Sequence, residues 1–328
     1  MYNKKYHNKN LNDFGFLITG GAGFIGSNLV EYLLKYNANK VRVLDDFSNG
    51  YRENLEEFRN NSSFELMEGD IRDLQTCKNA MDGIDYVSHQ AALGSVPRSI
   101  NDPATTNEVN ITGFLNMMIA LKDSKSVKRM VYAASSSTYG DSKALPKVED
   151  NIGKPLSPYA VTKYVNELYA DVFATTYNTD TIGLRYFNIF GPKQSPNGAY
   201  AAVIPLFMDA LQNNIPATIN GDGEQTRDFT YIENAIQANI KGIFAPKSSG
   251  NQVYNIACGE RISVNYLWDT LAKAANKKIN PIYGPPRQGD VRDSLANISK
   301  ANILLSYDPE FTVGQGLKIT WDYFKTKN

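Results

Sequence analysis

The chain is poor in the side chains that bind transition metals or form disulfides. Its 328 residues include only two cysteines and two histidines, which are Cys77, Cys258, His7 and His89. Two cysteines so far apart form neither a disulfide framework nor a zinc pattern, and they fit a reducing compartment. His89 ends an apolar run, which favours a structural role. We therefore expect no metal site.

The chain also lacks an excess of charge and long apolar runs. Lys+Arg and Asp+Glu both number 34, so the net charge of +0 gives no electrostatic reason to expect nucleic acid or an anionic membrane as a partner. Residues 1–12 are polar, unlike a secretory signal. No uninterrupted apolar run reaches the roughly 18 residues of a membrane span. We expect a cytoplasmic protein.

A glycine-rich turn follows the first apolar run, residues 14–19. Gly20, Gly23 and Gly26 lead into a helical pattern over residues 24–36. Strand, glycine turn and helix are typical of a dinucleotide-binding site. There Gly20 allows the tight turn, Gly23 lets the backbone approach the pyrophosphate, and Gly26 permits close packing.

The next strand carries an acid at its end. Residues 40–44 are followed by Asp45, which lies 19 residues after Gly26. An acid at this spacing binds the adenosine ribose hydroxyls and repels a 2′-phosphate, which favours NAD over NADP. Arg42 and Arg52 leave the NADP alternative open, because each could pair with such a phosphate.

Strand and helix patterns continue to alternate. Strands are expected at residues 64–67, 84–89, 128–134 and 181–187, with helices at 105–122 and 159–177. This order predicts an α/β fold with a Rossmann-type doubly wound parallel sheet, whose ligands bind at the carboxyl ends of the strands. We assign residues 1–180 to an NAD-binding domain and 181–328 to a smaller α/β substrate-binding domain. A segment around 231–258 is expected to return to the first domain.

Tyr159 and Lys163 lie four residues apart at the start of a helical run, on one face. An ammonium near a phenol favours the phenolate and lowers the phenol pKa, but reaching neutrality from about 10 takes roughly 4 kcal/mol. One lysine does not supply that much, so a second positive charge is expected. The serine-rich strand end Ser135-Ser136-Ser137 needs one hydroxyl beside Tyr159. No histidine follows it to support a nucleophilic serine.

The chain resembles the extended short-chain dehydrogenase/reductases, and within them the nucleotide-sugar 4-epimerases. The glycine turn, Tyr159-x-x-x-Lys163, Arg185-Tyr186-Phe187-Asn188, Arg227-Asp228 and Gly289-Asp290 follow the order of that family. Residues 90–99 and 196–205 look like hallmark segments of the bacterial UDP-N-acetylglucosamine 4-epimerases of surface-polysaccharide pathways. One departure is Asp293, where close relatives are expected to carry histidine beside the sugar pocket.

The resemblance implies the following roles. Tyr159 is the base, Lys163 holds the nicotinamide ribose, the nicotinamide is the second positive charge, and Ser135 is the catalytic hydroxyl. The cofactor-binding set is Gly20, Gly23, Phe24, Ile25, Gly26, Asp45, Asp46, Ser48, Asn49, Gly50, Asp70, Ile71, Gln90, Ala91, Ala92, Asn110, Tyr159, Lys163 and Tyr186. The UDP-sugar set is Ser95, Arg98, Ser135, Ser136, Ser137, Tyr159, Asn188, Ala199, Tyr200, Val203, Arg227, Arg287, Asp290 and Ser294.

Rival activities differ at these positions. A 4,6-dehydratase usually carries an Asp-Glu pair where this chain has Ser136 and Ser137, and a decarboxylase carries Glu at Ser137. A 4-epimerase for UDP-N-acetylglucosaminuronate or UDP-glucuronate stays open, because Arg98 could pair with a C6 carboxylate. A non-enzymatic NAD-binding regulatory protein is a rival of another class, but such proteins tend to lose the tyrosine or the lysine. The resemblance also implies a homodimer whose residues 105–122 and 159–177 form a four-helix bundle.

Overall fold

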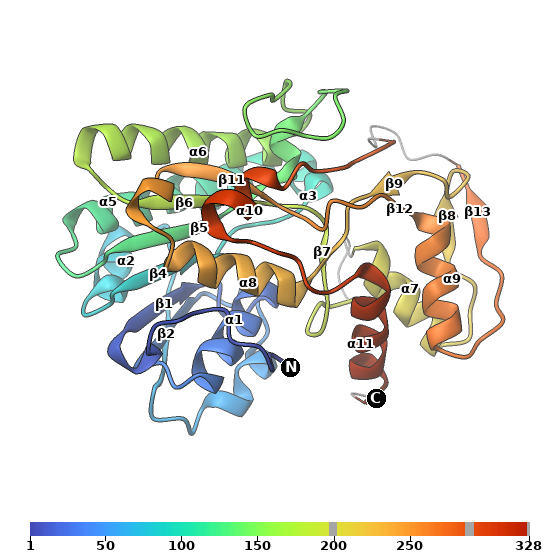
Figure 1. Ribbon diagram of the computed structural model, residues 1–328, viewed down its shortest axis with the longest axis horizontal. Helices are drawn as coiled ribbons and strands as arrows, with labels where there is room; N and C mark the ends of the chain where they lie inside the picture. The colour runs from blue at the N-terminus through green and yellow to red at the C-terminus, as the bar shows by residue number, and fades with distance from the viewer. Residues whose placement is uncertain (197–201, 286–291, 327–328) are drawn as a thin grey trace.

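A seven-stranded parallel sheet organises the molecule (Figure 1). The computed structural model describes residues 1–196, 202–285 and 292–326. Across the sheet the strand order is β11-β6-β5-β4-β1-β2-β3. The strands are β1 (Gly15–Thr19), β2 (Lys40–Asp45), β3 (Phe64–Glu68), β4 (Tyr86–His89), β5 (Arg129–Ser135), β6 (Thr181–Tyr186) and β11 (Gln252–Ile256). The predicted Rossmann-type sheet is confirmed.

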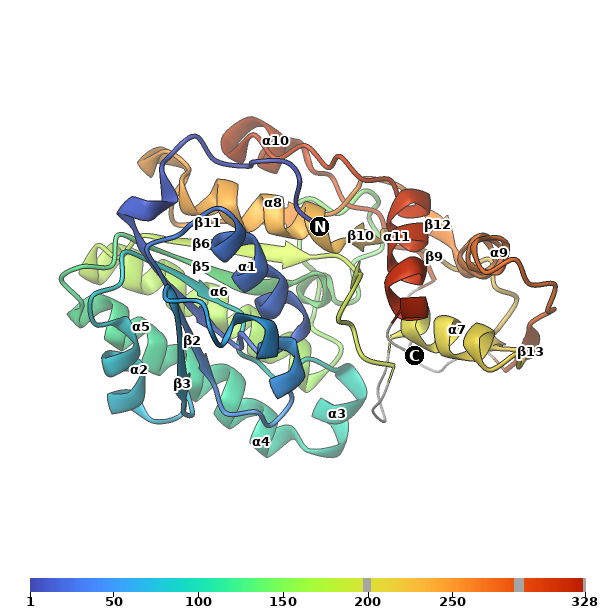
Figure 2. The ribbon, with the colours of Figure 1, turned by 90° about the horizontal axis from the view of Figure 1, so that it is seen from below.

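Helices cover both faces of the sheet, which buries its Val-, Ile- and Leu-rich strands on both sides. One face carries α1 (Phe24–Lys35) and α8 (Ile232–Ile243); the other carries α2 (Leu74–Met81), α5 (Gly113–Asp123) and α6 (Pro158–Tyr177), as Figures 1 and 2 show. Side chains alternate along β1. Phe16 and Ile18 pack into the core on the α1 side of the sheet, and Leu17 packs into the core on the other side.

The expected single helix over residues 105–122 is wrong in detail. The segment begins as α4 (Pro103–Asn107), widens to the π-helix η4 (Glu108–Thr112) and continues as α5. The wider turn brings the buried Asn110 side chain to the Leu93 backbone, with bonds of 2.8 and 3.1 Å, and to the Thr162 hydroxyl at 3.1 Å. These tertiary hydrogen bonds are invisible to periodicity.

A smaller unit lies beside the carboxyl end of the sheet (Figure 2). Its elements are α7 (Val203–Gln212), β8 (Thr218–Asn220), β9 (Thr226–Arg227), β12 (Ile262–Ser263), α9 (Val264–Ala274), β13 (Ile282–Gly284) and α11 (Val313–Thr326). The connections to the sheet are β7 (Ile189–Phe190), β10 (Thr230–Tyr231) and α10 (Ser299–Leu305). Between them, α8 and β11 lie with the large sheet, where β11 pairs with β6. The boundary at residue 180 stays a prediction.

Short elements complete the chain. They are α3 (Val96–Asn101) and the 3-10 turns η1 (Leu11–Asp13), η2 (Arg52–Asn54), η3 (Glu56–Phe58), η5 (Ser136–Tyr139) and η6 (Lys247–Ser249). Among the described residues, no helix is long and apolar enough to cross a membrane.

Candidate active site

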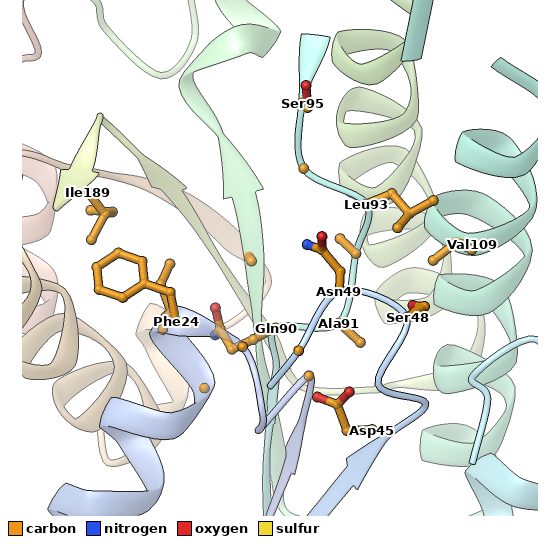
Figure 3. A pocket seen from close by; sticks show the side chains of 18 of the residues that line it. Phe24, Asp45, Ser48, Asn49, Gln90, Ala91, Leu93, Ser95, Val109 and Ile189 are labelled. Carbon is orange, nitrogen blue, oxygen red and sulfur yellow. The ribbon is translucent and has the colours of Figure 1, made fainter. Parts of the chain in front are cut away.

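A cavity of about 510 Å³ opens at the carboxyl ends of the strands. Its wall includes every predicted cofactor residue except Asn110, whose side chain instead holds Leu93. In Figure 3, Asp45, Ser48 and Asn49 lie at one end, Ser95 lies beyond Leu93, and Phe24 and Ile189 face them across the cavity. Tertiary folding thus brings these segments, far apart in sequence, to one sheet edge.

The glycine turn fits a pyrophosphate. Gly20 has φ +65° and its Cβ would lie 2.7 Å from the Ala91 nitrogen, so a side chain is excluded there. A Cβ on Gly26 would overlap the Gly20 carbonyl oxygen. The N-terminus of α1 begins at Phe24 and points its free N–H groups toward the cavity. The tight turn expected at Gly20 and the close packing expected at Gly26 are therefore what the backbone shows, while the approach of a pyrophosphate to Gly23 stays a prediction.

Asp45, the predicted ligand of the ribose hydroxyls, lies on the cavity wall at the end of β2. Its carboxylate accepts hydrogen bonds from Ala22 N and Phe47 N, both at 2.8 Å, which fixes its direction. Burial raises the pKa of this carboxyl above its usual value, and the two backbone bonds oppose that rise. The acid therefore anchors the turn and lines the cavity, where a bond to the adenosine ribose stays a prediction.

Arg42 and Arg52, the two arginines that left NADP as an alternative cofactor, bind other groups of the protein. The Arg42 guanidinium donates to the carbonyls of Ala80 and Asp82 at the end of α2, at 2.9 and 2.8 Å. Arg52 pairs with Glu68 at 2.7 Å and its guanidinium carbon lies 3.8 Å from the Phe47 ring centroid. With both arginines engaged and Asp45 on the cavity wall, the pocket fits NAD.

Tyr159 is brought to Ser135 by the start of α6. Ser157 caps this helix by accepting from Ala160 N at 3.1 Å, and Tyr159 follows in the first turn. Burial raises the pKa of Tyr159, while a hydrogen bond with the Ser135 side chain lowers it. Ser135 lines the cavity at the end of β5, and the Ser137 hydroxyl donates to it at 2.9 Å. Neither Ser136 nor Ser137 lines the cavity.

Lys163 lies one turn further along α6. Its ammonium donates to the Ala133 carbonyl at 2.8 Å and is buried, which lowers its pKa to about 8, although Glu167 opposes the shift. Burial and the Ser135 hydrogen bond are the causes that act on the Tyr159 pKa, and Lys163 is not among them. That Lys163 and a bound oxidised nicotinamide lower this pKa stays a prediction.

His89 is a neighbour that the sequence did not connect with the site. Its Nδ1 lies 2.7 Å from the Thr19 hydroxyl oxygen, which also accepts from Ala91 N at 3.2 Å. Burial and the Lys163 charge lower the His89 pKa to about 3. His89 is therefore a neutral structural residue beneath the cofactor loop, as its apolar context suggested.

A second cavity of about 270 Å³ adjoins the first. Both share Asn188, Ile189, Gln194 and Ala202, and the second is also lined by Val203 and Arg227. The Arg227 guanidinium donates to the Thr226 and Arg292 carbonyls at 2.8 and 3.0 Å. Asn188 donates to the Asp228 carbonyl at 2.9 Å, where the two cavities meet. Asn188 and Arg227 therefore lie on adjoining cavity walls, and their role as diphosphate ligands stays a prediction.

The remaining predicted substrate residues fall into three groups. Ser95 and Arg98 line the first cavity, where Arg98 donates to neutral Asn49 at 3.1 Å. Ser294 lines neither cavity, but its backbone donates to Thr226 O at 3.1 Å, next to Arg227. Four predicted residues lie outside the described part of the chain, namely Ala199, Tyr200, Arg287 and Asp290.

Asp293 lines neither cavity and is held at the outer edge of the smaller unit. Its carboxylate accepts from the Thr226 hydroxyl and from the Arg261 guanidinium, both at 2.6 Å. These bonds link β9 to the segment that follows the undescribed residues 286–291. Asp293 therefore makes an ion pair with Arg261 near Arg227, and the histidine expected here in close relatives stays a prediction.

The family model described as "NAD dependent epimerase/dehydratase family" matches residues 16–257. The chain belongs to this family. Its match covers β1 to the residue after β11, and therefore all of the cofactor-binding segments described above.

Individual relatives of this epimerase match over almost their whole length. The UDP-glucose 4-epimerase of Mycolicibacterium smegmatis is 33% identical over 95% of this chain and 99% of its own. The structure of UDP-N-acetylglucosamine 4-epimerase from Methanobrevibacter ruminantium, in complex with UDP-N-acetylmuramic acid, is 36% identical with a TM-score of 0.91, covering 96% of this chain and 99% of its own.

A third match holds the cofactor. The UDP-glucuronic acid 4-epimerase of Bacillus cereus, in complex with UDP-glucuronic acid and NAD, is 31% identical with a TM-score of 0.88, covering 96% of this chain and 100% of its own. Together with the family model, these matches point to an NAD-dependent UDP-sugar 4-epimerase, an isomerase.

Proposed function

We propose that this epimerase interconverts UDP-N-acetylglucosamine and UDP-N-acetylgalactosamine, and that UDP-glucose and UDP-galactose form a second substrate pair. The observation that carries the proposal is that Ser135, Tyr159 and Lys163 share the wall of a cofactor cavity that adjoins a second cavity lined in part by Arg227. The N-acetyl preference is supported by the hallmark segments at residues 90–99 and 196–205 and by the similarity to the Methanobrevibacter enzyme.

The residues of the chain would handle the proton and hold the substrate. Tyr159 takes the proton of the sugar 4-hydroxyl, either directly or through Ser135, and later returns it. Bound NAD would supply the redox chemistry, accepting hydride from C4 of the sugar and returning it to the opposite face. Lys163 would hold the nicotinamide ribose, while Asp45 and Asp70 would hold the adenosine.

The diphosphate must stay bound while the sugar turns its other face toward the cofactor. Arg227, Asn188 and Arg287 are the proposed diphosphate ligands, and Asp290 is the proposed ligand of the uridine ribose. A guanidinium–phosphate pair is charge-assisted, so it can anchor UDP without contacting the sugar. The residues that would hold UDP and the residues that would move the proton thus belong to different segments of the chain.

A panel of UDP-sugars tests the substrate. UDP-N-acetylglucosamine, UDP-glucose, UDP-glucuronate and UDP-N-acetylglucosaminuronate are each incubated with purified protein, and the C4 epimers are measured by NMR or chromatography. The highest kcat/KM is expected for UDP-N-acetylglucosamine. Conversion of the uronic acids alone would overturn this preference. Bound NAD without conversion of any sugar would favour the regulatory alternative.

The uronic acid alternative depends on Arg98. This cation lines the cofactor cavity, and its hydrogen-bond partner Asn49 is uncharged. A C6 carboxylate could replace Asn49 as that partner. If UDP-glucuronate is a substrate, Arg98→Ala should lower its kcat/KM about a hundredfold, since a charge-assisted pair contributes about 1.5–3 kcal/mol. UDP-N-acetylglucosamine should then lose much less.

We also propose a homodimer. On α6, Val161, Leu168 and Val172 are exposed at 45%, 48% and 53%, and their spacing puts them on one helix face. Such a stripe fits helix pairing between two copies, with residues 105–122 as the second helical segment. Leu156 and Ile100, exposed at 58% and 60%, extend the apolar surface.

A further inference from the structure

A buried asparagine connects three elements beneath the cofactor cavity. Asn239 lies on α8 and is 0% exposed. Its amide nitrogen donates to the Tyr186 phenol oxygen at 2.7 Å and to Ala235 O at 2.8 Å. Its carbonyl oxygen accepts from the Ser88 hydroxyl and from the Gln90 amide, both at 3.1 Å. Asn239 is therefore fully engaged and belongs to no site described above.

Two of its partners form the cavity wall on either side of the catalytic strand. Tyr186 ends β6 in register with Ser135 of β5, and Gln90 follows β4, which pairs with β5 on the other side. Both residues line the cavity, and Figure 3 shows Gln90 at its centre. Gln90 also donates to the Ser88 hydroxyl at 2.9 Å and to the Tyr186 oxygen at 3.2 Å.

The network contains only uncharged groups. Burial raises the pKa of Tyr186 to about 12, although the hydrogen bonds from Asn239 and Gln90 oppose that rise. An amide, a second amide, a hydroxyl and a phenol therefore meet here without an ion. A rigid neutral wall matters next to a nicotinamide, because the ring is cationic when oxidised and neutral when reduced. A charge nearby would favour one state over the other.

We propose that Asn239 is a positioning residue that holds Tyr186 and Gln90 as a neutral wall at the nicotinamide end of the cavity, and thereby sets how readily bound NAD is reduced. The proposal rests on the NAD dependence of the proposed function and not on the identity of the sugar. Asn239 acts through its two partners and does not itself line the cavity.

Asn234 offers a matched control on the same helix. It is also 0% exposed and makes a comparable set of bonds, donating to Phe311 O at 2.9 Å and accepting from the nitrogens of Glu310 and Phe311. These bonds hold the segment before α11, away from the cavity. Asn234→Ala should therefore reproduce the stability loss of Asn239→Ala without its effect on the cofactor.

The experiment measures the NAD content of each subunit and the rate at which borohydride reduces bound NAD in the presence of UDP. Asn239→Asp should slow this reduction about tenfold at mildly alkaline pH, because a carboxylate stabilises the cationic ring. Asn239→Ala should lower the NAD content of the purified subunit, because its partners Tyr186 and Gln90 are no longer held on the cavity wall. Asn234→Ala should match the parent protein in both measurements.

Equal values for the Asn239 and Asn234 variants would overturn the inference. If the Asn239 variants do not fold, Tyr186→Phe removes only the hydroxyl to which Asn239 donates, and an unchanged reduction rate in that variant would equally overturn it. Absence of NAD from the unmodified protein would instead contradict the cofactor assignment. Because no sugar is used, the outcome is independent of the substrate proposal.

Discussion

The Ser137 hydroxyl donates a hydrogen bond to the Ser135 hydroxyl oxygen at 2.9 Å, and the Ser137 backbone nitrogen donates to the same oxygen at 3.2 Å. With both of these donors at its oxygen, the Ser135 proton is free to point toward Tyr159, to which its side chain is hydrogen-bonded. Ser137 thus prepares Ser135 to donate to the phenol oxygen. Among the three consecutive serines at the end of β5, Ser135 has its hydroxyl at the cavity and Ser137 supports it from behind.

Replacing Ser135 by alanine should reduce kcat by about a hundredfold, the lower range of general acid–base effects. Ser137→Ala keeps the reacting hydroxyl and loses only its orientation, so a reduction of about tenfold is expected. Steady-state kinetics with saturating UDP-sugar would measure both. If Ser137→Ala were the more damaging change, Ser137 and not Ser135 would be the proton carrier.

Tyr159→Phe should abolish turnover, with kcat at least about a thousandfold lower, because the proposed base is removed while the ring is kept. NAD content and UDP-sugar affinity, measured by calorimetry, should persist. Tyr254→Phe is the control: it also loses one buried phenol bond, to Ser249 O at 2.7 Å, outside the cavity. Near-normal activity of Tyr159→Phe would contradict the assignment.

The buried His89 should make the free energy of unfolding depend on pH. Burial, with a smaller effect of the Lys163 charge, lowers its pKa from 6.5 to about 3. Between about pH 6.5 and about pH 3, His89 binds a proton in the unfolded chain but not in the folded chain. The contribution of neutral His89 to the free energy of unfolding is therefore complete above about pH 6.5 and is lost as the pH falls toward about 3.

His89→Asn removes this titration. Its free energy of unfolding relative to the parent protein should therefore improve by about 3 kcal/mol on going from about pH 7 to about pH 4. Denaturant unfolding at both pH values gives the comparison. Parallel pH profiles of the two proteins would show that His89 does not titrate in this way.

The exposed stripe on α6 predicts how the subunit associates. Leu168→Glu puts a charge into the proposed helix–helix contact and should convert a dimer into monomers at micromolar concentration, as measured by analytical ultracentrifugation. Ile303→Glu is the control, because Ile303 is 74% exposed but lies on α10. Dissociation by Ile303→Glu, with Leu168→Glu still dimeric, would place the interface elsewhere.

Ser294 is the proposed limit on sugar size, because the resemblance to the nucleotide-sugar epimerases implies that a small residue at this position admits N-acetyl groups. Ser294 lines neither cavity itself, but its backbone is bonded to Thr226, next to Arg227. Ser294→Tyr should lower kcat/KM for UDP-N-acetylglucosamine by at least about tenfold and spare UDP-glucose. Competition between the two sugars in one reaction would show the difference. Equal losses for both sugars would contradict this role of Ser294 in limiting sugar size. An unchanged preference between the two sugars would contradict it as well.

The sequence by itself determined the parallel sheet, the cofactor turn and the pair Tyr159 and Lys163. These depend on local signals: apolar runs with helical or strand periodicity, glycines at fixed spacing, and an acid at a strand end. Each is specified within a few tens of residues, so it can be read without knowing where the rest of the chain lies. The NAD preference also began there, at Asp45.

Only the tertiary structure decided the contacts between distant segments. Ser135 was placed on the cavity wall without Ser136 and Ser137, Arg42 and Arg52 were found to be engaged, and the helix around Asn110 was found to widen into a π-turn. The choice of Ser135 as the catalytic hydroxyl came from the family resemblance. No sequence pattern predicted the role of Asn239, because a polar residue in an amphipathic helix is expected to face solvent. Its hydrogen bonds reach residues 149 and 53 positions away, and such partners exist only once the sheet has formed.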